Sequence, residues 1–515
     1  MQVPVYVRSA LIAFVVFCTV AFLAFGRVLS GEFISDDTYW IGASVASSDK
    51  QEIVGQIRRW TYRPVTSGMA FVAKAAFGER AYAWHAMSIV LHAANGLLLF
   101  LLLPRLVPDL RWGVALLLTL AFLLHPAGSE GVLWISAQAE LSGALFILLF
   151  FHCYLRWRNE WTLSRLLGTG AIAMVACFSK ETAIVLPVLV LAFELLFRAN
   201  SWLAIAKAVS VVATASVVFL LSRMLALGSI SGGVNTEGSL VRVAELAAAH
   251  FGFIWFPHAP PFAIRPPEIS LVSTGELTLS ILAFLSLMLW AWRSRESRRI
   301  AIFATIWGVV LIWPAYVVAS AQEGFFNGRQ AYIATIAVPM LLAAVWKIVE
   351  RSSQAASGLA LILTLAWMAY ATSNHAEAWR TNLGVFRQNL AVSPGSDELR
   401  AAVAAEEAEA GQADAALKTY GEIVLRTHDL RMRTKYLFDM ARITGQAKRL
   451  AESNVYLEEA LKLQPLYVPA WTGLGNNAWV EGRLADAEFF YRRALTIDPS
   501  NYEANENLKS MLKRR

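Results

Sequence analysis

Charged residues are scarce in this sequence, and their scarcity argues against a soluble globular protein. The chain has 515 residues, of which 16% are charged and 57% hydrophobic, whereas roughly a quarter of the residues in soluble domains are charged. Residues 374–515 hold 19 basic and 19 acidic residues, so the net charge of +7 belongs to residues 1–373. The sequence therefore predicts an apolar membrane part followed by a neutral, charge-rich tail.

Cysteine is also rare. The three cysteines, Cys18, Cys153 and Cys177, lie in or at the ends of apolar stretches. An odd number without a CxxC motif offers no disulfide framework and no cysteine-based metal site. In an apolar helix, a single cysteine usually acts as a small packing residue. The tail contains no cysteine, so we expect it to fold without disulfide support.

About eleven stretches approach the ~20 apolar residues that a membrane-spanning helix needs. They are approximately residues 8–28, 85–103, 112–126, 132–153, 163–178, 182–197, 207–226, 272–292, 300–319, 331–349 and 357–373. Basic clusters fall on every second connection, which places the N-terminus in the cytoplasm under the positive-inside rule. Because that rule explains the surplus of basic residues, we expect no nucleic-acid partner.

The stretch 240–268 breaks this pattern, because it carries several charges and ends in a proline-rich run. We interpret it as an interfacial or re-entrant segment, because one more span would place the basic cluster Arg293–Arg299 outside the cytoplasm. With this segment excluded, the tail lies outside the cytoplasm. That compartment is the periplasm in a bacterium and the lumen of the endoplasmic reticulum in a eukaryote.

The tail, residues 374–515, has an internal period of 34 residues. Ala460-Leu461 is repeated at Ala494-Leu495, and Pro465 is repeated at Pro499. This is the period of the tetratricopeptide repeat, in which paired helices stack into an α-solenoid. We expect three to four repeats, with a concave surface that binds a protein or peptide and with Trp471 and Tyr491 as acceptor contacts.

The longest connection between predicted spans, residues 29–84, contains an acidic pair. Asp36 and Asp37 follow the first apolar segment within Phe33-Ile34-Ser35-Asp36-Asp37. Either carboxylate could simply cap a following helix. At a membrane surface, however, a carboxylate is partly desolvated and becomes a better base, so the pair is also a candidate for catalysis.

Other ionisable residues fall near the same predicted face of the membrane. They are His85, His92, His125, Glu130, Glu140, Lys180, Glu181 and Arg329. An ionisable group at the centre of a membrane helix costs ~2.5–3.5 kcal/mol on insertion scales, so such groups usually face a cavity. Individually, Lys180 could pair with Glu181, and Arg329 could reach lipid headgroups. Together they predict a polar cleft at one face.

Such a cleft suits the transfer of a sugar from a polyprenyl-phosphate carrier to an acceptor hydroxyl. A carboxylate would accept the hydroxyl proton, and a cationic side chain would neutralise the departing phosphate. The predicted spans would supply a groove for the carrier's chain. The acidic pair lacks the spacing of an established metal site, so the sequence allows a divalent metal without supporting one.

Six motifs occur in an order that resembles a known family. They are Phe33–Asp37, Tyr62–Thr66, Trp84-His85 with Leu91-His92, Leu124-His125-Pro126 with Glu130 and Glu140, Phe178–Thr182, and Gly328–Tyr332. The series resembles the transmembrane and tetratricopeptide-repeat-containing O-mannosyltransferases, which are GT-C glycosyltransferases. The resemblance covers nearly the whole chain. It implies an all-α fold, with a GT-C-type helix bundle over residues 1–373 and a repeat solenoid over residues 374–515.

The resemblance also implies an inverting transfer of mannose or another hexose to protein Ser/Thr hydroxyls. It identifies Asp36 as the general base, with Asp37 as the alternative. It assigns Arg329, Lys180, Arg63 and His125 to the donor phosphate, with His85, Glu130, Glu140 and Glu181 in support. An arginine of the family's fourth-span motif is replaced by Gln138, which leaves sugar and acceptor open.

Three alternatives remain at this stage. The acceptor could be a lipid or glycan instead of a protein. The chain could be a membrane scaffold whose repeats recruit envelope-assembly proteins without catalysis. A transporter is disfavoured, because transporter sites lie near the middle of the membrane.

Overall fold

The computed structural model describes residues 5–38, 41, 62–197, 201–228, 240–258, 274–321, 328–350 and 354–513. All regular elements within these ranges are helices, as the sequence predicts. Much of the acidic loop 29–84 and most of the proline-rich run after Pro257 lie outside the described residues. The chain divides into two units, Met1–Val385 and Phe386–Arg515. This boundary lies beyond the predicted residue 373, because the last apolar helix continues to Ala378.

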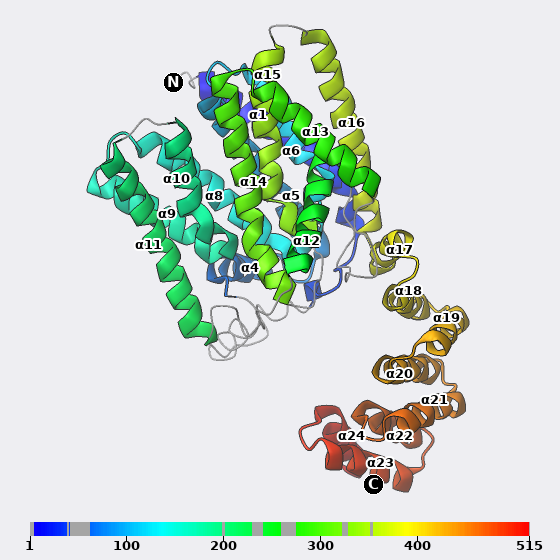
Figure 1. Cartoon of the computed structure of the whole chain (residues 1–515). Coiled ribbons are helices and arrows are strands. Elements are labelled where there is room, and N and C mark those ends of the chain that lie inside the picture. Colours follow the sequence, from blue (N-terminus) through cyan, green and yellow to red (C-terminus); the bar gives the residue numbers. More distant parts are fainter. Residues whose placement is uncertain are drawn as a thin grey trace. The chain divides into compact units, whose positions relative to one another are not determined.

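Unit 1 is a bundle of apolar helices (Figure 1), and short 3-10 turns lie in some of the connections between them. Its α-helices are α1 Val5–Phe25, α4 Pro64–Phe77, α5 Ala81–Leu106, α6 Trp112–Leu123, α7 Glu130–Leu133, α8 Gln138–Trp157, α9 Leu163–Ser179, α10 Leu186–Phe197, α11 Trp202–Leu227, α12 Leu240–Trp255, α13 Thr274–Ala291, α14 Arg295–Ala321, α15 Ala337–Val349 and α16 Gln354–Ala378. The turns are η1 Gly26–Ser30, η2 Pro126–Gly128, η3 Ile135–Ala137, η4 Glu181–Val185, η5 Gly328–Ala331 and η6 Ala334–Ile336.

The centre of unit 1 is formed by α5 and α8, which pack against each other, and α1 packs on α5. Helices α9, α10 and α11 lie side by side at one edge (Figure 1). Peripheral helices expose large apolar side chains, including Leu23 on α1, Leu289 on α13 and Leu363 on α16. This distribution is unfavourable in water but matches a surface that contacts lipid.

Eight helices of the described residues are long and apolar enough to cross a membrane, or nine if one bent pair counts as a single span. Three of the eleven predicted spans do not form a single helix long enough to cross a membrane. In the predicted span 112–126 the helix ends at Leu123, and the next helical segment, Pro126–Leu133, is bent by 54° relative to it. The predicted spans 163–178 and 182–197 correspond to α9 and α10, of 17 and 12 residues. In both regions, polar or proline residues interrupt the apolar run.

Unit 2 consists of a first helix, three helical hairpins and a final helix. They are α17 Asn382–Val392, which begins in unit 1, then α18 Asp397–Glu409 with α19 Ala413–Arg426, α20 Leu430–Gln446 with α21 Leu450–Leu463, α22 Val468–Val480 with α23 Leu484–Ile497, and α24 Tyr502–Lys513. The two helices of each hairpin pack together. The 34-residue period therefore corresponds to helix pairs, as predicted.

The turn inside each hairpin requires a residue with positive φ. Gly411 and Gly482 supply it at φ 85° and 76°, and Lys448 supplies it at φ 59°. Glycine adopts this conformation without steric cost, whereas lysine does not. In the middle hairpin the turn therefore falls at Lys448, three residues after the Gly445 that continues the glycine period. This accounts for the irregular sequence of that repeat.

Candidate functional site

The two adjacent aspartates of the first loop have opposite environments. Asp36 is exposed, whereas Asp37 is fully buried. One oxygen of Asp37 accepts hydrogen bonds from the Ser136 backbone N–H (2.7 Å) and hydroxyl (2.8 Å), and the other accepts from the Ile34 N–H (3.0 Å). Both oxygens of Asp37 are therefore used in fixing the loop to η3. Asp36 is therefore the accessible carboxylate of the pair, whereas Asp37, predicted as the alternative base, is buried and hydrogen-bonded.

Burial raises the pKa of Asp37 to about 7, although the hydrogen bonds from Ile34 and Ser136 act in the opposite direction. Burial favours the neutral form of a carboxyl group, and hydrogen-bond donors favour its charged form. The same contacts orient the loop so that the neighbouring Asp36 faces outward. Asp37 is thus a structural residue of the acidic loop.

Arg63 and Glu181 form a bidentate ion pair across 118 residues of sequence. Arg63 Nε lies 2.7 Å from Glu181 Oε2, and Arg63 Nη2 lies 2.5 Å from Oε1. Arg63 precedes α4, whose first residue is Pro64, and Glu181 begins η4. Burial alone would raise the pKa of Glu181, but the charges of Arg63 and Lys180 lower it below its usual range. Glu181 is therefore ionised and neutralises Arg63.

Lys180 forms its ion pair with Glu140. The prediction that Lys180 could pair with its neighbour Glu181 is therefore wrong as to the partner. Lys180 follows the last residue of α9, and Glu140 lies in the first turn of α8. Both residues are almost completely buried. A buried pair of this kind is costly to break, because the remaining charge loses its compensation.

Arg329 differs from the other two cations in its partners. Its backbone N–H donates to Glu130 Oε2 (2.8 Å), and its guanidinium lies over the Trp134 ring, 4.1 Å from the ring centroid. Among the described residues, no carboxylate lies within ion-pair distance of this guanidinium. Since an aromatic face favours a cation without neutralising it, Arg329 keeps a charge that a ligand could neutralise.

These residues form one cluster, although they come from distant parts of the sequence. The charges of Glu140, Arg63, Asp36 and Glu130 all act electrostatically on Arg329. Lys180 interacts with Arg63, Glu181 and Arg329 in the same way. The fold thus brings the acidic loop, the start of α4, the α7–η3 segment, the α9–η4 turn and η5 together. The cluster combines ion pairs that are largely shielded from solvent with an exposed carboxylate and a guanidinium that forms no ion pair with the described carboxylates.

The two predicted histidines of the site are buried and serve structural roles. His125 is bonded through both ring nitrogens, with Nε2 3.1 Å from the Ile254 carbonyl and Nδ1 accepting from the Ala127 N–H. The assignment of His125 to the donor phosphate is therefore wrong, because neither nitrogen is free. His85 Nε2 lies 3.5 Å from the Glu32 carbonyl, so it supports the acidic loop from α5.

The predicted acceptor contacts in unit 2 also differ. Tyr491 is fully buried, its ring packs where Gly475 leaves room for it, and its hydroxyl donates to Asn476 Oδ1 (2.7 Å). Tyr491 is therefore a core residue and not an acceptor contact, which corrects the prediction. Trp471 is partly exposed, and its indole N–H donates to the Pro465 carbonyl (2.9 Å). Only Trp471 remains available at the surface.

Several residues of the site were not predicted. Ser136 holds Asp37, Trp134 supports Arg329, and the phenol of Tyr332 bonds to His92 Nδ1 (2.7 Å) and Asn95 Nδ2 (3.0 Å). The Tyr332 contacts fix η5, which carries Arg329, to α5. The motif Gly328–Tyr332 already contains Tyr332, and its partner His92 was among the predicted polar residues. Trp134 and Ser136 lie between the predicted Glu130 and Glu140, which is the only sequence signal for them.

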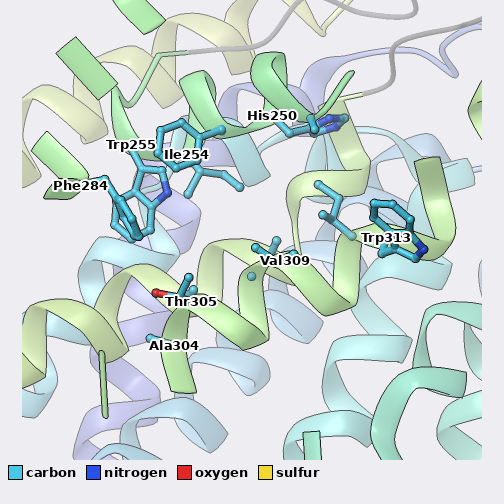
Figure 2. A pocket seen from close by; sticks show the side chains of 14 residues that line it. His250, Ile254, Trp255, Phe284, Ala304, Thr305, Val309 and Trp313 are labelled. Atoms are coloured by element: carbon cyan, nitrogen blue, oxygen red, sulfur yellow. The ribbon is translucent and has the colours of Figure 1, made fainter. Parts of the chain in front are cut away.

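An apolar cavity of ≈ 200 Å³ lies among α12, α13, α14 and the η6–α15 segment. Figure 2 shows Trp255 and Phe284 together on one side and Trp313 on the other. The centroids of the Trp255 and Phe284 rings lie 5.0 Å apart. Thr305 contributes one of the few polar groups of the lining. The cavity is suited to a hydrocarbon chain and not to a polar ligand.

Within the described ranges, no group of three or more His, Cys, Asp or Glu side chains is placed to hold a metal ion. Glu130 and Glu140 both act electrostatically on Arg329; Glu130 Oε2 accepts from the Arg329 N–H, and Glu140 pairs with Lys180.

The comparisons with known proteins identify no family. No protein-family model and no curated protein matches the sequence. Among solved structures, the chain is similar to PilW, described as a widely conserved type IV pilus biogenesis factor, with 13% identity over 34% of this chain and 80% of that chain and a TM-score of 0.23. It is also similar to the APC/C hetero-tetramer Cut9-Hcn1, with 12% identity over 93% of this chain and 99% of that chain and a TM-score of 0.25. At these scores, neither similarity carries an argument about function.

Proposed function

We propose that this chain is a membrane glycosyltransferase that transfers a sugar from a polyprenyl-phosphate carrier to a hydroxyl group. The observation that carries the proposal is that Asp36 and Arg329 belong to one electrostatic cluster. The exposed Asp36 carboxylate acts electrostatically on the Arg329 guanidinium, which forms no ion pair with a described carboxylate. A proton acceptor and a site for an anionic leaving group therefore belong to one cluster.

The reaction follows from these two groups. The oxygen of the acceptor hydroxyl attacks the anomeric carbon from the side opposite the phosphate, and Asp36 accepts the proton of that hydroxyl. The bond between that carbon and the phosphate oxygen breaks, and its electron pair leaves with the polyprenyl phosphate. Arg329 neutralises the charge that develops on the phosphate. One displacement at the anomeric carbon inverts its configuration.

The remaining residues of the cluster have supporting roles in this proposal. Lys180 is already paired with Glu140, and Arg63 with Glu181. We therefore assign Lys180 and Arg63 to the electrostatic potential of the site, and Arg329 to binding the phosphate. The apolar cavity lined by Trp255, Phe284 and Trp313 offers a place for part of the carrier's hydrocarbon chain. Apolar surroundings that exclude water strengthen the attraction between charged groups such as Arg329 and the phosphate.

The helical hairpins of unit 2 support a protein acceptor, because stacked helix pairs of this kind form extended surfaces for peptides. The likeness to the O-mannosyltransferases agrees with Ser/Thr hydroxyls as acceptors and with a hexose donor. In this proposal the N-terminus is cytoplasmic, and the site and repeats lie outside the cytoplasm.

The test uses the purified full-length protein in liposomes. Radiolabelled polyprenyl-phosphate mannose and polyprenyl-phosphate glucose are supplied with an unstructured Ser/Thr-rich protein, a lipid-linked glycan and a membrane lipid. Label on the protein's hydroxyls supports the full proposal, and label on the glycan or lipid moves the acceptor to that class. If none of the three acceptors is labelled from either donor, while repeat-bound proteins co-purify, the non-enzymatic scaffold replaces the proposal.

A further inference from the structure

The acidic loop is held by residues that lie almost 350 positions away in the sequence. The Ser35 N–H donates to Asn382 Oδ1 (2.8 Å), and the Asn382 N–H donates to Glu32 Oε1 (2.8 Å). The Glu32 N–H also donates to the Arg380 carbonyl (3.0 Å). We call Glu32, Ser35, Arg380 and Asn382 the loop clamp. The four residues belong to unit 1, although Asn382 is the first residue of α17, which continues into unit 2.

The loop clamp brings the two backbones into direct contact. A Cβ atom placed on Gly31 would lie 2.9 Å from the Arg380 carbonyl oxygen, a distance that real Cβ atoms do not reach. Glycine at position 31 therefore permits the hydrogen bond of the next residue, Glu32. The approach is a built feature of the loop and not an incidental contact between exposed side chains.

Ser35 has an unfavourable backbone conformation. Its φ is 55°, in the left-handed region that a residue other than glycine adopts only when its surroundings compensate. This conformation turns the chain between buried Ile34 and exposed Asp36, after which Asp37 is buried again. The hydrogen bond from Ser35 to Asn382 acts on the residue that makes this turn.

From these contacts we infer that Asn382 is a positioning residue for Asp36. Its side-chain oxygen holds Ser35 in the left-handed conformation, and this conformation directs Asp36 toward the site while Asp37 anchors the loop at Ser136. The catalytic consequence of this inference rests on the proposed function, whereas the role of Asn382 in ordering the loop does not.

The experiment compares three variants of the full-length protein. Asn382→Ala removes the acceptor for the Ser35 N–H, and Asn382→Asp keeps an acceptor oxygen at the same place. Thr381→Ala is the matched control, since Thr381 Oγ1 accepts from the Gly384 N–H within α17 and not from the described part of the loop. Hydrogen exchange of the peptide covering residues 31–38 is measured together with kcat and the donor KM.

We expect faster exchange of this peptide in Asn382→Ala and wild-type exchange in Thr381→Ala. Exchange in Asn382→Asp should lie between the two, because its second carboxylate oxygen replaces the amide donor to Glu32 Oε1 (3.5 Å) and repels that carboxylate. The kcat of Asn382→Ala should fall about 10-fold, with donor KM within about twofold of wild type, because misplacing the base affects the chemical step more than binding. Asn382→Asp should restore part of the kcat. Adding Ser35→Gly to Asn382→Ala should recover part of it, since glycine adopts φ 55° without the clamp.

The outcomes separate this inference from the proposed function. Unchanged exchange in Asn382→Ala overturns the loop clamp whatever the activity. Faster exchange with a wild-type kcat overturns the positioning of Asp36. If wild-type protein transfers no sugar but Asn382→Ala exchanges faster, the ordering role stands and the proposed function fails.

Discussion

In the candidate site of unit 1, ion pairs join residues far apart in the sequence and are largely shielded from solvent, as in Arg63–Glu181 and Lys180–Glu140. Among the described residues of unit 2, five of the nine ion pairs join residues three or four positions apart, as in Arg492–Glu488, and each of the nine pairs has at least one exposed partner. Exposed pairs of this kind contribute little to stability, whereas buried charges are expensive. The comparison separates charges of unit 1, which depend on their buried partners, from charges of unit 2, which can be removed at little cost in stability.

The largest effect on stability should come from breaking the Lys180–Glu140 pair. Lys180→Met leaves Glu140 buried without a partner, which should lower the free energy of unfolding by about 3–5 kcal/mol. Thermal unfolding in detergent measures this loss. The double variant Lys180→Met/Glu140→Gln should recover much of it, because no uncompensated charge remains. A single variant as stable as wild type would contradict the difference between the two units.

The next effect concerns Arg329, whose charge is not compensated by a described carboxylate. Arg329→Ala should lower kcat/KM for the polyprenyl-phosphate sugar about 10²-fold, as expected for a group that neutralises developing charge. Arg329→Lys should lose less, about 10-fold, because it keeps the charge but loses the planar contact with Trp134. Steady-state transfer assays measure both variants. Equal losses in the two would mean that charge is not what Arg329 contributes.

A smaller effect should follow from the titration of Asp37. Its pKa of about 7 in the folded protein exceeds the ~3.9 of an unfolded chain, so the folded state binds the proton more tightly. Stability from this group is therefore present at low pH and is lost as the pH rises from about 4 to about 7. The Tm of wild type relative to Asp37→Asn should fall by a few degrees between pH 5 and pH 8. A Tm difference that is independent of pH would show that Asp37 does not titrate in this range.

The smallest effect should come from the surface of the repeats. Arg492→Met removes the exposed pair with Glu488 on α23 and should change stability by less than about 0.5 kcal/mol. Thermal unfolding of the full-length variant tests this value beside Lys180→Met. A loss comparable to that of Lys180→Met would erase the contrast between the two units.

Much of the fold could be predicted from the sequence, because it depends on local patterns. Long apolar runs predicted the helices of unit 1, and the 34-residue period predicted the hairpins of unit 2. Lys180 shows where such patterns fail: its partner is Glu140, 40 residues away, and not the adjacent Glu181. Tyr491 fits the repeat pattern, but only the packing against Gly475 shows that it is buried.

Many residues of the candidate site could be named from the sequence, but not all of its members and not their contacts. The acidic pair was evident, whereas the difference between Asp36 and Asp37 depends on Ser136, 99 residues away from Asp37. His125 likewise depends on a distant residue, because its Nε2 is hydrogen-bonded with the carbonyl of Ile254. Tertiary contacts of this kind decide which polar group stays accessible, and no spacing in one sequence records them.

The most direct test of the central claim is single-turnover transfer from a labelled polyprenyl-phosphate sugar by wild type, Asp36→Asn and Asp36→Glu, with protein and donor held fixed. If Asp36 is the general base, Asp36→Asn should slow the transfer by ~10²–10⁴-fold without loss of donor binding or of thermal stability, and Asp36→Glu should retain more of the rate. Transfer by Asp36→Asn at the wild-type rate would contradict the account.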